Sequence, residues 1–74
     1  MNRLTVSDDD CLAYIGRKIR IEKGDTVLVG TVNGMSAAVV AVGVSTVIRP
    51  WELQTKDATV AFVPSDGWKL YATP

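Results

Sequence analysis

The chain has 74 residues, with eight basic and eight acidic side chains, no histidine and a single cysteine. These counts allow one domain, exclude an intrachain disulfide, and leave no cysteine–histidine ligand set for zinc, so we expect no cofactor or metal. The formal net charge of zero removes any global attraction to nucleic acid or to an anionic membrane. Because so small a domain buries only a modest core, we expect self-association unless that core suffices.

The first predicted element is a short helix over Asp8 to Ile15. Ser7 is a preferred N-cap residue, and Asp10, three residues later, completes a capping-box pattern. We interpret the aspartates as helix-capping residues and not as a cation site, because consecutive carboxylates on a helix point in different directions. The segment before the helix has no apolar run of signal-peptide length, and a lone cysteine suits a reducing compartment. We therefore expect a cytoplasmic protein.

Strands are predicted to follow the helix. Arg17 to Glu22 alternates apolar and charged residues, as a half-buried strand does. After a turn, Thr26 to Val32 forms a second strand, in which Gly30 marks a bend, a bulge or a close backbone approach. The dipeptide Asn33-Gly34 is a strong hairpin signal, so we predict a turn there that leads into a third strand over Ala37 to Val42.

The second half of the chain is predicted to complete a small sheet. Its elements are a fourth strand, a connection, a fifth strand, a turn and a sixth strand that pairs back, over Val44–Arg49, Trp51–Asp57, Ala58–Val63, Pro64–Gly67 and Trp68–Ala72. The pattern predicts a mainly β fold for residues 1–74. We expect a small five- to six-stranded antiparallel barrel or strongly bent sheet with one short N-terminal helix.

One alternative comes from the uncharged stretch Thr26 to Ile48, which is long enough to cross a bilayer as a helix. Asn33-Gly34 near its middle and its many β-branched residues favour strands instead. We therefore expect no membrane partner.

Leu12 to Met35 combines a helical lead, a Gly-Arg-Lys strand start at Gly16 and a strand with a central glycine, Gly30. This order resembles the opening of Sm-like and Src-homology-3-like β-barrels, which implies a small barrel. The Sm family's RNA-binding signature is absent, because residues 33–37 read Asn-Gly-Met-Ser-Ala, so the resemblance does not imply the RNA site. The layout, with its Gly-Trp-Lys-Leu-Tyr ending, also looks like small accessory proteins of actinobacterial phages.

Catalysis is not expected. The one nucleophile candidate, Cys11, has no histidine base and follows three aspartates, which disfavour a thiolate. We interpret Cys11 as a small buried apolar residue.

The leading functional prediction is a non-enzymatic module that binds protein, either as a homo-oligomer or as an accessory factor, for which a phage is one expected source. Ala37 to Val42 offers apolar side chains to both faces of its sheet, and the second face needs cover. The predicted interface consists of Val39, Ala41, Trp51 and Trp68. For the two tryptophans, packing over the core is an equal alternative.

The alternative function is a nucleic-acid-binding barrel. Its predicted face consists of Arg17, Lys18, Arg20 and Lys23. Lys18 and Arg20 share one strand face, where they would follow phosphates, and a nearby aromatic ring (Tyr14, Trp51, Trp68 or Tyr71) would stack on bases. Zero net charge favours an ordinary solvated strand face instead.

Overall fold

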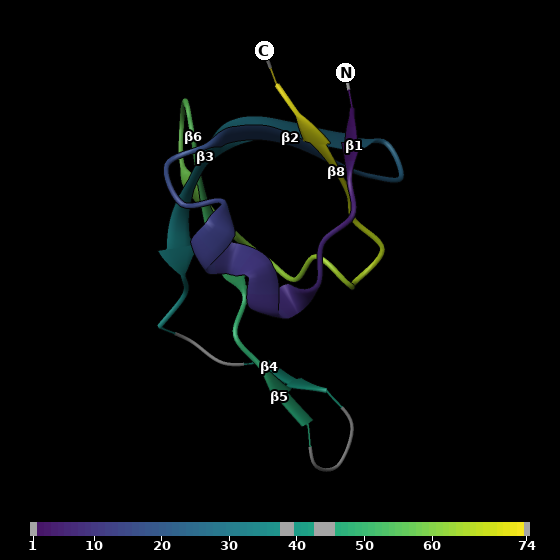
Figure 1. The fold of residues 1–74 in the computed structure, drawn as a ribbon, viewed down its shortest axis with the longest axis vertical. Helices are drawn as coiled ribbons and strands as arrows, with labels where there is room; N and C mark the ends of the chain where they lie inside the picture. The colour runs from purple at the N-terminus through teal and green to yellow at the C-terminus, as the bar shows by residue number, and fades with distance from the viewer. Residues whose placement is uncertain (1, 38–39, 43–45, 74) are drawn as a thin grey trace.

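The computed structural model describes residues 2–37, 40–42 and 46–73, with side chains for all of these except 40–42, 46 and 47. Its elements are β1 (Arg3–Leu4), η1 (a 3-10 helix, Asp8–Ala13), β2 (Lys18–Lys23), β3 (Thr26–Met35), β4 (Val40–Val42), β5 (Thr46–Ile48), β6 (Trp51–Thr55), β7 (Thr59–Phe62) and β8 (Lys69–Ala72). Six strands form one antiparallel sheet in the order β1-β8-β2-β3-β6-β7, and β4 pairs with β5 separately (Figure 1). The predicted mainly β fold is therefore confirmed, as a bent sheet that does not close.

The sheet curves around a single apolar core, and η1 lies across its open side (Figure 1). The alternation predicted for the first long strand is confirmed, because Ile19 and Ile21 are buried while Lys18 is exposed. Burying a side chain of this size contributes about 1.5–3 kcal/mol. The core consists of Cys11, Ile19, Ile21, Val32, Trp51, Leu53, Phe62 and Leu70.

The predicted N-terminal helix is confirmed, although it is a 3-10 helix and ends at Ala13. The Asp10 carboxylate accepts a hydrogen bond from the backbone N–H of Ser7 at 2.8 Å, as a capping box requires. From the core, the indole Nε1 of Trp51 donates to the backbone carbonyl of Asp8 at 3.0 Å. A helix too short to be stable alone is thus held by the strand beneath it.

The predicted turn at Asn33-Gly34 is wrong. Both residues lie inside β3, which runs on to Met35 and pairs with β6. The pairing shifts between Val32 and Gly34, so Asn33 is the extra residue of a β-bulge, and Gly34 adopts a positive φ of 141°. The backbone conformations that Asn and Gly readily adopt suit a tight turn and a bulge alike. The non-local pairing with β6 selected the bulge.

The close approach predicted at Gly30 is confirmed. A Cβ at this position would overlap the backbone carbonyl oxygen of Gln54 on the adjacent strand β6. Glycine is therefore required where β3 and β6 meet.

Two expectations for the C-terminal half are wrong. Trp51 to Asp57 is not a connection, because its first five residues form β6 between β3 and β7. Trp68 to Ala72 does not pair back on the preceding strand: β8 lies between β1 and β2, with Leu70 opposite both Leu4 and Ile21. The two-residue strand β1 was not predicted. Strand partners so distant in sequence leave no local signal.

The arm, which we define as β4 and β5, lies away from the six-stranded sheet (Figure 1). Val40, Ala41 and Val42 pair with Ile48, Val47 and Thr46, which confirms the core of both predicted strands. In the described part of the chain, no helix has the length and apolar character needed to cross a bilayer. The transmembrane alternative is wrong for the described residues between Thr26 and Ile48, because most of them form strands.

Candidate functional site

Basic side chains gather on the outer face of β1, β8 and β2. Tyr71 on β8 is the direct partner of Arg3 on β1 and of Arg20 on β2, and Lys69 is opposite Glu22. Residues paired directly across strands point to the same side of a sheet. Because Leu70 between them points into the core, Lys69 and Tyr71 both face outward.

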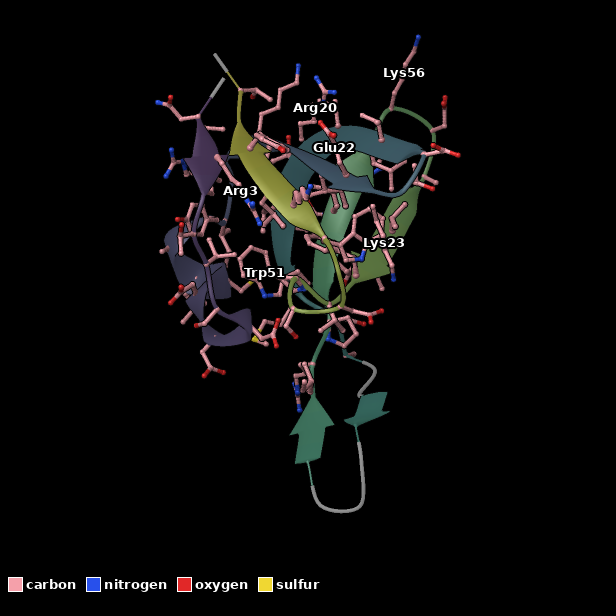
Figure 2. All side chains as sticks on the ribbon, turned by 90° about the vertical axis from the view of Figure 1, so that its right-hand side faces the viewer. Arg3, Arg20, Glu22, Lys23, Trp51 and Lys56 are labelled. Carbon is pink, nitrogen blue, oxygen red and sulfur yellow. The ribbon has the colours of Figure 1, made fainter. Side chains whose placement is uncertain are left out.

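The charges of this outer face are unequal. Its cations are Arg3, Lys18, Arg20 and Lys69, and its one carboxylate among the described residues of these three strands is Glu22. Glu22 forms an ion pair with Arg20, in which Oε2 lies 2.8 Å from Nη2 (Figure 2). The Nε of Arg20 is buried and has no hydrogen-bond partner in the described part of the chain. One terminal nitrogen of the Arg20 guanidinium is therefore paired, whereas its buried Nε is unsatisfied.

The structure does not gather the four predicted nucleic-acid-binding residues on one face. Lys18 and Arg20 lie on the outer face, as expected. Arg17 instead lies over the ring of Tyr14, 5.2 Å from its centroid. Lys23 Nζ lies 5.7 Å from the centroid of Trp68 and pairs with an Asp66 carboxylate oxygen at 3.1 Å.

Arg3 and Lys69 were not predicted to belong to this face. Alternation within Lys69 to Ala72 was enough to place Lys69 beside Tyr71 on one face of a strand. Nothing local indicated that β8 lies next to β2, so the meeting of these residues with Lys18 and Arg20 is a tertiary result.

The two tryptophans of the predicted interface occupy different environments. Trp51 is fully buried and stacks with Tyr14 at a centroid distance of 5.9 Å, so the alternative of packing in the core holds for it. Trp68 is half-buried and packs edge-on against Phe62 at 5.9 Å. Val39 lies outside the described residues. So does the side chain of Ala41, whose backbone belongs to the arm.

Exposed apolar side chains lie near the end of β3 that leads to the arm. Leu12 on η1 is 78% exposed, Ile15 after the helix is 46% exposed, and Met35 at the end of β3 is 40% exposed. We call these three residues the root patch. The Cδ1 atom of Ile15 lies 3.9 Å from where a Cβ on Gly34 would stand, which brings the helix end next to the end of β3.

A hollow of about 230 Å³ lies beside the edge strand β1. Its walls are Arg3, Leu4, Thr5, Val6, Pro64, Trp68 and Leu70. One of these residues, Arg3, also belongs to the outer face. Among the described residues of its wall, Arg3 is the single charged side chain, so the hollow lacks the group of converging charges that would fix a charged small ligand.

Cys11 lies in the core, and burial raises the pKa of its thiol above the ordinary value of 9.0. A neutral, enclosed thiol is a poor nucleophile. Within residues 2–37, 40–42 and 46–73, no three side chains of histidine, cysteine, aspartate or glutamate group as metal ligands would.

No protein-family model, curated protein or solved structure matches this chain. The resemblance to Sm-like and Src-homology-3-like barrels therefore stays a prediction, and function is argued from the chain's own residues.

Proposed function

We propose that the protein is a non-enzymatic binding module that associates with a second copy of itself through the arm. The observation that carries the proposal is that β4 and β5 form a sheet of their own, in a segment, 37–48, without any charged residue. A lone two-stranded hairpin is at best marginally stable in water. Among the described residues its outer edges have no strand partner, and its sequence is apolar at both alternating sets of positions, so a second chain would stabilise it.

The root patch supports a second copy as the partner. It is apolar, it belongs to the same molecule, and it lies near the end of β3 that leads to the arm. Two copies related by a two-fold axis would each lay an arm on the root patch of the other, forming a closed, self-complementary interface. The arm and the root patch also carry opposite charges. Arg49 at the base of the arm is exposed, and so is Asp9, which lies on η1 near Leu12.

The proposed function also includes a cellular compartment and a source. A free, buried Cys11 supports a reducing compartment such as the cytoplasm. A role as a phage accessory factor rests on the layout of the sequence alone and stays a prediction.

Light scattering coupled to size-exclusion chromatography tests the proposal. The wild-type protein is expected to be dimeric at micromolar concentration. Val40→Lys in the arm and Leu12→Lys in the root patch should each give monomers. Val29→Lys, at a 41% exposed apolar position on the outward face of β3, is the matched control and should leave the dimer intact.

Mixing the two variants distinguishes the reciprocal dimer from an arm-to-arm dimer. In the reciprocal dimer, an intact arm from Leu12→Lys can still bind the intact root patch of Val40→Lys, so the mixture should form a weak heterodimer. In an arm-to-arm dimer, Leu12→Lys alone would remain dimeric. A wild-type protein that stays monomeric at high micromolar concentration would contradict the proposal.

A further inference from the structure

We propose a second, independent site: the outer face of β1, β8 and β2 binds single-stranded nucleic acid. In this site Tyr71 stacks on a base, and Arg3, Lys18, Arg20 and Lys69 contact phosphates. These strands and the arm lie at opposite ends of the molecule (Figure 1), so the site does not depend on self-association.

The positive charge of the outer face favours binding of a polyanion. The whole chain is neutral, yet this one face has four cations and one carboxylate among its described residues. Adjacent strands are about 4.8 Å apart, so these cations lie within a Debye length of about 8–10 Å of their neighbours, and their attraction for a polyanion adds. Most of the compensating carboxylates lie on other elements, namely η1 and the turns: Asp8, Asp9, Asp10, Asp25, Asp57 and Asp66.

The position of Tyr71 favours a single strand over a duplex. Arg3, Tyr71 and Arg20 form one row across three strands, and Val29 extends the row onto β3 opposite Arg20. Figure 2 shows Arg3 and Arg20 on either side of β8. A half-buried tyrosine ring with exposed valine nearby offers stacking and apolar surface to an unpaired base, while the guanidinium groups reach its phosphates. Bases stacked inside a duplex cannot reach such a ring.

Glu22 weakens the site in the free protein. It holds the terminal Nη2 of Arg20 in an ion pair at 2.8 Å. A phosphate that replaced Glu22 as the partner could accept from two nitrogen atoms of the guanidinium at once. Removing this carboxylate should therefore tighten binding, an effect opposite in sign to that of removing a cation.

Fluorescence anisotropy with labelled oligothymidine, oligouridine and a DNA duplex tests the site. Both single strands should bind more tightly than the duplex, with log K falling by about 0.7 per phosphate contact for each unit of log salt. Lys18→Gln and Arg20→Gln should each weaken binding several-fold and flatten this slope. Glu22→Gln should tighten binding several-fold.

Two matched pairs separate the site from general charge and folding effects. Lys23→Gln removes the same charge from the same strand as Lys18→Gln, but on the opposite face, and should change affinity less than twofold. Tyr71→Ala should lose about tenfold or more in affinity, whereas Tyr71→Phe, which keeps the ring, should lose little. Circular dichroism confirms that each variant is folded.

Several results would overturn the proposal. These are no binding to either single strand at low salt, equal losses for Lys18→Gln and Lys23→Gln, and binding to anionic vesicles without binding to oligonucleotides. The monomeric Val40→Lys variant should bind oligothymidine with wild-type affinity per chain. The proposal of a nucleic-acid site and the proposal of self-association can therefore be refuted independently.

Discussion

Asp8 and Ser65 are joined by two hydrogen bonds although 57 positions separate them: Oδ1 of Asp8 accepts from the backbone N–H at 3.0 Å, and Oδ2 accepts from the hydroxyl at 2.6 Å. This pair ties the start of η1 to the turn before β8. Because the pair is exposed, we expect Asp8→Ala to lower the free energy of unfolding by about 1.5 kcal/mol, the low end for a hydrogen bond to a charged group. Urea denaturation measures the loss. Asp9→Ala, a change at the exposed neighbouring position, should stay within about 0.5 kcal/mol of wild type.

Gly30→Ala should be the most damaging glycine substitution. The new Cβ would overlap the Gln54 carbonyl oxygen, and relieving that overlap requires β3 and β6 to separate. We expect a loss of about 3 kcal/mol or more in thermal or urea unfolding. Gly24→Ala is the control. It meets nothing within 4 Å and carries only the cost of a positive φ of 57°, about 1–2 kcal/mol. Equal losses for the two variants would contradict the close approach.

Trp51→Phe should destabilise the protein more than Trp68→Phe does. The first change removes the hydrogen bond to the Asp8 carbonyl and leaves space in the core, at a cost of about 2–3 kcal/mol. The second acts on a half-buried ring and should cost about 1 kcal/mol. Acrylamide quenching checks the assignment independently: fluorescence left in Trp68→Phe should be protected, and fluorescence left in Trp51→Phe should be quenched.

Cys11 should make stability fall at alkaline pH. Burial raises the pKa of its thiol in the folded state, so the unfolded chain releases this proton first as the pH rises past about 9.0. The unfolded state then binds fewer protons than the folded state, and stability falls by at most about 1.4 kcal/mol per pH unit. The measurement is the difference in unfolding free energy between wild type and Cys11→Ala, from pH 7 to pH 10.5 (roughly the range that spans the thiol). The wild-type advantage should shrink only in the upper part of that range. A difference that does not change with pH would contradict a buried thiol.

The sequence by itself determined the elements whose signals are local. Alternation in Lys18 to Glu22 identified β2 and its buried isoleucines, and Ser7 with Asp10 identified the start of η1. Gly30 indicated a bend, a bulge or a close backbone approach, and the structure shows the close approach. The alternation of Trp51 and Leu53 with Glu52 and Gln54 was also present, but this segment was predicted to be a connection, and β6 was missed.

Only the tertiary structure decided which strands meet. Asn33-Gly34 satisfies the backbone requirements of a tight turn and of a bulge equally well, and pairing with β6 chose the bulge. The insertion of β8 between β1 and β2 likewise placed Arg3, Lys69 and Tyr71 beside Arg20. The physical reason is that a strand's hydrogen bonds must be satisfied by another strand, and burial over the whole chain selects that partner. Residue identity along the chain specifies which face a side chain takes, whereas strand order specifies its neighbours on that face.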